Sequence, residues 1–111
     1  MISRSKRMND SVIRVGKIEV DSRQRMVMIS GREIELHPKE FDLLYFLIQH
    51  PGWVYTKEQI YDMVYEGERP VDIDNIIYCL IYSLRKKLEE NPTKPKFIQT
   101  VRGVGYRFCK E

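Results

Sequence analysis

The sequence predicts an α+β fold in which short strands are followed by three helices and a closing β-hairpin. Three observations carry this prediction. Apolar residues alternate with polar ones up to Leu36, as in strands, and then recur every three or four positions from Pro38 onward, as in helices. A glycine pair near the C-terminus separates two further apolar runs. Residues 1–10 are polar and basic, so we expect a linker or tail there and one domain over residues 11–111.

Four segments of strand length come first. They read VIRV, KIEV, RMVMI and REIEL, and turn signals separate them at Gly16, DSRQ and SGRE. Antiparallel strands can be joined by such short turns, whereas parallel strands need long crossovers. The segment before the helices is therefore predicted to be a four-stranded antiparallel meander.

The first helix is predicted to begin at Pro38, because proline fits the first helical turn, and to end at HPG. In YTKEQIYDMVY, Thr56 and Gln59 are spaced as a capping box, which predicts a second, short helix. The apolar face of the first helix is predicted to consist of Phe41, Leu43, Leu44, Leu47 and Ile48.

A third helix is predicted in VDIDNIIYCLIYSLRKKLEEN. Either Asp72 or Asp74 can cap its start, and the prolines of NPTKP end it. Its buried stripe has spacings of four, three and four residues and consists of Ile77, Ile81, Leu84 and Leu88.

Two strands, KFIQTV and GYRFC, are predicted to close the chain as a hairpin. Gly103 and Gly105 permit a tight turn, from which Arg102 would project. The second helix, the turn and the third helix then form a helix-turn-helix, and the hairpin forms a wing. The predicted architecture is a winged helix-turn-helix with an N-terminal four-stranded antiparallel sheet, three helices and a C-terminal β-hairpin wing.

Charge is distributed unevenly along the chain. The net charge of +3 divides into +3 for residues 1–35, −5 for residues 36–75 and +5 for residues 76–111. A basic C-terminal third is the electrostatic footprint of a polyanion-binding surface, although a solvated charged surface has the same composition.

The outer face of the third helix is where base contacts are expected, because an α-helix fits the major groove. Asn75 can pair with adenine, whereas Ile76 and Cys79 can contact thymine methyl groups. The same partly apolar face would also suit a protein partner, so a protein-interaction winged helix is the alternative function. The face is predicted to consist of Asn75, Ile76, Cys79, Tyr82, Ser83 and Lys86.

The hairpin is expected to contribute a second set of contacts. Arg102 at the tip suits a narrow minor groove or a phosphate, and the hydroxyls of Thr100 and Tyr106 are candidate phosphate donors. The alternative for Tyr106 and Phe108 is that they pack on the core.

Other classes of function have little support in the sequence. Cys79 and Cys109 form no CxxC pair, and no Ser/His/Asp, Cys/His or metal-ligand set has plausible spacing, so we expect no enzyme activity, metal or cofactor. No apolar run approaches a membrane helix and no signal peptide is apparent, which favours a cytoplasmic protein without membrane contact.

The chain resembles the OmpR/PhoB-type winged-helix effector domain of two-component response regulators. The resemblance runs from about Val12 to Phe108, and its specific parts are LHPKEFDLLYFLIQHPGWVYTKEQI, SLRKKLE and IQTVRGVGYRF. His37 departs from the family, which usually has threonine or serine before that proline. The resemblance implies a sequence-specific double-stranded DNA-binding domain that regulates transcription, with the third helix in the major groove and the wing in the minor groove.

The resemblance also assigns residues and partners. Lys57 matches a phosphate contact, and Tyr65 stands where a backbone-contacting tryptophan is frequent. Residues 65–72 match the segment that faces RNA polymerase in activators. Tandem dimers on DNA and an N-terminal receiver domain are implied as well, although a free-standing regulator is an alternative. The remaining matches are Ile76, Cys79, Leu80, Tyr82 and Ser83 in the groove and Thr100, Arg102 and Tyr106 in the wing.

Backbone contacts are expected from the basic end of the third helix. Lys86 and Lys87 are the candidates there. Arg85 has two interpretations, a phosphate contact or an ion pair with Glu40 of the first helix.

Overall fold

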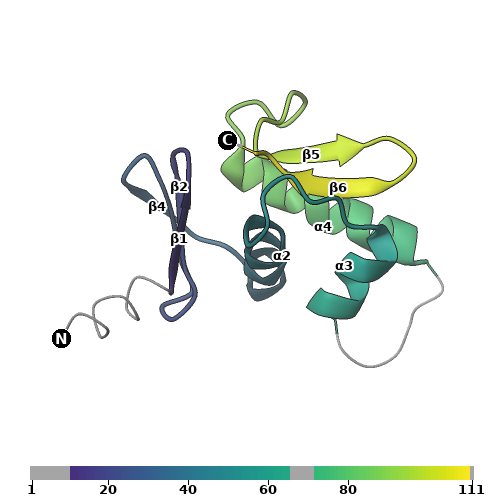
Figure 1. Cartoon of the computed structure of the whole chain (residues 1–111), viewed down its shortest axis with the longest axis horizontal. Helices are drawn as coiled ribbons and strands as arrows, with labels where there is room; N and C mark the ends of the chain where they lie inside the picture. The colour runs from purple at the N-terminus through teal and green to yellow at the C-terminus, as the bar shows by residue number, and fades with distance from the viewer. Residues whose placement is uncertain (1–10, 66–71, 111) are drawn as a thin grey trace.

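A computed structural model of the chain describes residues 11–65 and 72–110. It shows an antiparallel sheet at the N-terminal side, one helix between this sheet and the remaining helices, and a hairpin lying along the last helix (Figure 1). The predicted α+β class and the order of strands, helices and hairpin are confirmed.

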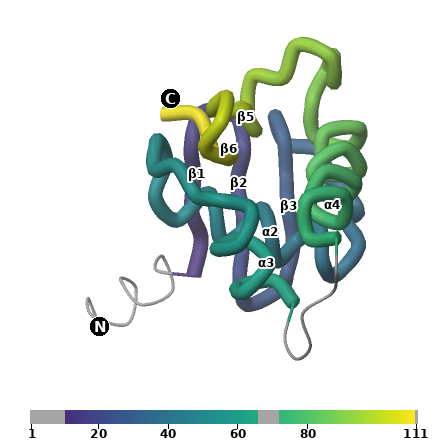
Figure 2. Tube along the Cα trace, turned by 90° about the vertical axis from the view of Figure 1, so that its right-hand side faces the viewer, coloured from purple at the N-terminus to yellow at the C-terminus, as the bar shows by residue number. Residues whose placement is uncertain are grey.

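The N-terminal sheet is a four-stranded meander in which each strand pairs with the next in sequence. Its register places Val20 opposite both Ile13 and Val27, so apolar side chains gather on one face. A view turned by 90° shows the strands side by side (Figure 2). The strands are β1 (Val12–Val15), β2 (Ile18–Asp21), β3 (Met26–Ile29) and β4 (Arg32–Ile34).

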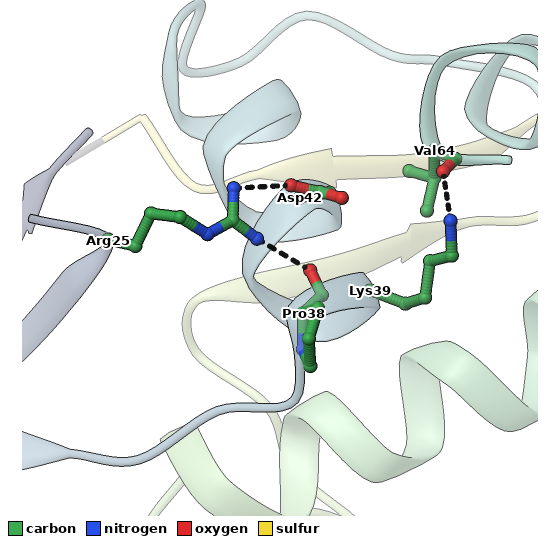
Figure 3. A network of polar contacts seen from close by, with 5 residues as sticks. All are labelled: Arg25, Pro38, Lys39, Asp42 and Val64. Atoms are coloured by element: carbon green, nitrogen blue, oxygen red, sulfur yellow. Dashed lines mark hydrogen bonds and ion pairs between the residues drawn. The ribbon is translucent and has the colours of Figure 1, made fainter. Parts of the chain in front are cut away.

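Arg25 links this sheet to the first helix. It lies in the turn before β3 with a φ of 50°. Its guanidinium pairs with the carboxylate of Asp42 at 3.0 Å and donates to the carbonyl of Pro38 at 3.2 Å (Figure 3). It also lies 4.6 Å from the ring centre of Phe41. One side chain therefore fixes the sheet against the start and one face of that helix.

Three helices follow, and each begins with the expected local chemistry. The backbone N–H of His37 donates to Glu40 at 2.8 Å. Thr56 and Gln59 form the predicted capping box. Asp72, rather than Asp74, caps the last helix. The helices are α2 (Pro38–Ile48), α3 (Lys57–Val64) and α4 (Ile73–Leu88).

The predicted apolar stripes form one hydrophobic core between the helices, the sheet and the hairpin. All five residues predicted for α2 and all four predicted for α4 are buried. Burying a large aliphatic side chain contributes about 1.5–3 kcal/mol, so these helices are held chiefly by packing.

Helix α4 ends at Leu88, several residues before the prolines of NPTKP that were predicted to end it. Glu89 is buried, and its carboxylate accepts hydrogen bonds from the backbone N–H groups of Lys96, Phe97 and Ile98 at 2.7–3.2 Å. The C-cap of the helix, Glu89, has an extended backbone and holds the returning chain through its side chain. Glu89 thereby sets where the hairpin begins relative to α4.

The hairpin consists of β5 (Ile98–Val101) and β6 (Gly105–Phe108). A contact that the sequence did not reveal adds a third chain segment to it: Tyr55 and Tyr106 exchange two backbone hydrogen bonds of 2.9 Å. At Gly105 the approach is so close that a Cβ atom would lie 1.9 Å from the carbonyl oxygen of Tyr55. Only glycine fits at this position. The hydrogen bonds of Tyr55 join the wing to the segment just before α3.

Candidate nucleic-acid interface

The face of α4 opposite the core is exposed. Asn75, Cys79 and Lys86 are exposed, and Tyr78 and Tyr82 are 60% and 52% exposed. The ammonium group of Lys86 lies 5.5 Å from the ring centre of Tyr82. A polar and aromatic helix face with a cation beside it has the chemistry of a surface that meets both bases and phosphates.

Leu80 does not belong to the exposed part of this face, and its groove contact stays a prediction. It is buried with 9% exposure in the hydrophobic core, because its position lies beside the stripe of Ile77 and Ile81. Ile76 and Ser83 are half-buried at the margin of the exposed face, where contact with a ligand remains sterically open.

Tyr78 is an exposed residue of this face that is not among the residues predicted from the sequence. An aromatic residue next to the buried Ile77 resembles a core residue in sequence. The signal that could have included it is its spacing of four residues from Tyr82, which was predicted to lie on the outer face.

The tip of the wing projects from the protein. Gly103 has a φ of +76°, which L-residues rarely adopt, and the N–H of Val104 donates to the carbonyl of Val101 to close the turn. Arg102 and Val104 are exposed. Arg102 therefore lies at the hairpin tip, as predicted.

Arg85 fastens the base of the wing to α4. Its Nε and Nη2 donate to the carbonyl of Ile98 at 3.1 and 2.8 Å, and Nη2 also donates to Thr100 Oγ1 at 2.8 Å. Burial lowers the pKa of the Arg85 guanidinium, and the neighbouring Tyr106 and Glu89 act in the opposite direction. The ion pair with Glu40, one of the two interpretations of Arg85, is not found among the described residues, because the guanidinium is directed to these wing acceptors instead.

The two candidate hydroxyls of the wing have different surroundings. Thr100 is exposed, and its oxygen already accepts the Arg85 bond, so its own proton is available to a phosphate. Tyr106 is only 6% exposed and Phe108 is fully buried. The alternative in which both rings pack on the core is the one that the structure supports.

A groove of about 400 Å³ lies between the wing and the first turns of α3 and α4. Lys57 and Glu58 line it from α3, Asp74 from α4, and residues 100–106 from the wing. Across it, the ammonium group of Lys57 and the carboxylate of Asp74 are 3.7 Å apart. Three sequence-distant elements with candidate DNA contacts thus meet at one place.

Tyr65 lies at the other end of α3, away from this groove. Its ring stacks on Tyr61 with 4.8 Å between centres, and the ammonium of Lys39 lies 4.8 Å from the Tyr65 ring centre. The same Lys39 donates to the carbonyl of Val64 at 3.0 Å (Figure 3). Burial, with Tyr61 as a smaller cause, raises the pKa of Tyr65.

Lys87 has a structural partner. Its ammonium group binds the carboxylate of Glu40 at 2.7 Å, and Glu40 is 4% exposed. This is the ion pair that had been considered for Arg85. The predicted phosphate contact of Lys87 would have to compete with a buried carboxylate.

We therefore expect Lys87→Met to lower stability more than DNA affinity. Leaving the buried Glu40 without its cation should cost about 1–3 kcal/mol in the free energy of unfolding, measured by urea denaturation. Lys86→Met is the matched control, because Lys86 is exposed and should lose affinity with little loss of stability. A Lys87→Met protein of unchanged stability and weakened DNA binding would contradict this assignment.

The described residues show no group of three or more His, Cys, Asp or Glu side chains placed to hold a metal ion. Within the same ranges, no helix has the length and apolar content needed to cross a bilayer.

An exposed second helix of a helix-turn-helix, beside a hairpin with arginine at its tip, is the arrangement of winged-helix DNA-binding domains. The family profile described as "Transcriptional regulatory protein, C terminal" matches residues 31–108. The chain belongs to this family, the effector domains of OmpR/PhoB-type response regulators, which confirms the resemblance found in the sequence.

Relatives and solved structures agree with this assignment. The sensory transduction protein RegX3 of Mycolicibacterium smegmatis is 36% identical over 99 residues, which cover 89% of this chain and 43% of RegX3. The Klebsiella pneumoniae RstA DNA-binding domain, solved in complex with the RstA box, has a TM-score of 0.81 and 32% identity over 90% of this chain and 98% of that one. The Thermotoga maritima response regulator DrrB has a TM-score of 0.81 and 31% identity over 97% of this chain and 50% of that one.

These comparisons support the DNA-binding interpretation and not the protein-interaction alternative. The chain spans less than half the length of RegX3.

Proposed function

We propose that this chain is the DNA-binding part of a transcriptional response regulator, with α4 in the major groove and the wing in the adjacent minor groove. The observation that supports the proposal is the meeting of the first turn of α4, the wing tip and Lys57 around one groove, with the exposed face of α4 continuing along the same helix. Arg85 supports it by holding the wing to α4 at a fixed place, so both elements can approach one duplex together.

Base reading is assigned to the exposed and marginal residues of α4. Few charged groups lie on this face, so we expect A·T-rich sites in which Ile76 and Cys79 contact thymine methyl groups. Asn75 is exposed in the first turn, where its amide can pair with adenine. Tyr82 and Ser83 complete the readout.

Affinity is assigned chiefly to the phosphate backbone. The proposed contacts are Lys57, Lys86 and Thr100, a choice supported by the position of Lys57 in the groove and the exposure of Lys86 and Thr100. Each neutralised phosphate adds about −0.9 to the slope of log K against log salt, so a strong salt dependence is expected.

The whole protein is proposed to have further parts and partners. Its relatives are more than twice as long, which supports an N-terminal receiver domain joined through residues 1–10. Residues 65–72 are proposed to contact RNA polymerase, although residues 66–71 lie outside the described part of the chain. Two copies would bind tandem half-sites in the cytoplasm. The family is one of DNA-binding regulators, and we propose no enzyme activity.

Arg102→Ala tests the wing. Loss of the guanidinium from the minor groove should weaken binding by about 1–3 kcal/mol and relax the preference at one edge of the half-site. The readout is fluorescence anisotropy with duplexes selected from a random DNA pool. Arg32→Ala, an exposed arginine in β4, is the matched control and should leave affinity unchanged. Equal affinity of Arg102→Ala and wild type, with an intact fold, would refute the wing assignment.

A further inference from the structure

An acidic side chain lies among the candidate phosphate contacts. The Asp74 side chain is 71% exposed in the first turn of α4, and its carboxylate is 3.7 Å from the ammonium of Lys57. It faces the groove that the wing also lines. The helix does not need this residue as its cap, because Asp72 accepts the N–H of Asn75. The carboxylate of Asp74 therefore contributes to the helix only through its negative charge in the first turn and its pair with Lys57, and not as the cap.

We propose that Asp74 is a specificity-determining residue that suppresses binding to non-cognate DNA. The inference rests on the proposed function and goes beyond it, because it assigns a role to a residue that opposes binding. Asp74 acts in two ways: it neutralises Lys57 in the free protein, and it presents a negative charge to the phosphates that Lys57 approaches.

The penalty falls most heavily on non-specific complexes. Binding to arbitrary DNA relies almost wholly on phosphate contacts and counterion release. For Lys57 to bind a phosphate, its pair with Asp74 must be given up, and the carboxylate is left beside like charge. Solvent-exposed ion pairs of this kind contribute little free energy each. The penalty is therefore small for one contact, but it applies at every non-cognate site.

At the cognate site the carboxylate recovers this cost. The first turn of a recognition helix reaches base edges, where the amino groups of cytosine and adenine are the hydrogen-bond donors of the major groove. Asp74 can accept from such an amino group only when the correct base lies opposite it. The same carboxylate therefore weakens binding to non-cognate DNA and does not weaken binding to the cognate site.

The test compares Asp74→Asn with wild type on a selected duplex and on a scrambled duplex of the same composition. Affinity for scrambled DNA should rise about 3- to 10-fold, whereas affinity for the selected duplex should rise clearly less. The salt slope on scrambled DNA should steepen by about 0.9, because Lys57 now neutralises a phosphate in full. A gain in affinity cannot result from misfolding, so partial destabilisation does not imitate this outcome.

Two further variants distinguish an effect of the Lys57–Asp74 pair from an effect of the protein's net charge. Glu90→Gln makes the same change in net charge just beyond the opposite end of α4 and should alter scrambled-site affinity much less. In a Lys57→Met background, the gain from Asp74→Asn should shrink, because the two residues are coupled.

Two results would overturn the inference. Equal gains in affinity on selected and scrambled DNA would show that Asp74 does not discriminate between sequences. Equal effects of Asp74→Asn and Glu90→Gln would show that only the net charge of the protein matters. Failure of the wild-type protein to bind any duplex would instead refute the proposed function, and the two failures are thus distinguishable.

Discussion

Gly105→Ala is expected to detach the wing from the helix-turn-helix. The added Cβ would lie 1.9 Å from the carbonyl oxygen of Tyr55, and the nearest atoms all belong to backbone that cannot rotate away. Relief requires the hydrogen bonds between Tyr55 and Tyr106 to break or lengthen. We expect a loss of about 3 kcal/mol or more in the free energy of unfolding, measured by urea denaturation, and a large loss of DNA affinity.

Gly103→Ala is the control for this effect, since it adds the same methyl group two residues away. A Cβ at Gly103 meets nothing within 4 Å, so the only cost is the left-handed φ of +76°, about 1–2 kcal/mol. Equal losses for the two variants would mean that backbone conformation, rather than the contact with Tyr55, makes glycine necessary in the wing.

Glu89→Ala is expected to have the second largest effect. Removing the carboxylate leaves the N–H groups of Lys96, Phe97 and Ile98 without their acceptor in a largely buried place. We expect a loss of about 2–4 kcal/mol in the free energy of unfolding. Amide exchange should rise at these three positions first, because they lose the bonds directly.

The neighbouring Glu90 provides the control, because it is exposed and Glu90→Ala should change stability by less than about 0.5 kcal/mol. The loss of stability for Glu89→Gln should lie between those of Glu89→Ala and Glu90→Ala, since a neutral amide oxygen still accepts hydrogen bonds but more weakly. If Glu89→Ala were as stable as Glu90→Ala, the carboxylate would not organise the turn into β5.

The fold was predictable wherever its determinants are local. Alternation defined the strands, the spacing of Ile77, Ile81 and Leu84 defined the buried side of α4, and the Thr56 and Gln59 pair defined the start of α3. Contacts between distant segments were not predictable in this way. The pairing of Tyr55 with β6 has no signature in the sequence, because any residue offers the same backbone groups.

The site was predictable in outline and less so in its partners. Arg102 stands at the turn as expected, because glycine positions define the tip. The burial of Leu80 was not anticipated, because its assignment to the groove came from a family position and not from the spacing of the apolar residues of α4. The choice between Arg85 and Lys87 as the partner of Glu40 depends on which side of α4 faces α2 and which faces the wing, and only the packed structure decides it.

The hydrogen bonds between Tyr55 and Tyr106 have a consequence for the length of the DNA target. They join the segment before α3 to the wing sheet, and Arg85 of α4 binds β5, so a shift of the wing relative to these helices requires hydrogen bonds to break. Each base pair inserted between their contacts would move one relative to the other by about 3.4 Å and rotate it by about 35° around the duplex axis. In the proposed complex, the fold of the domain would therefore set the distance and the helical phase between the DNA segment contacted by α4 and the one contacted by the wing.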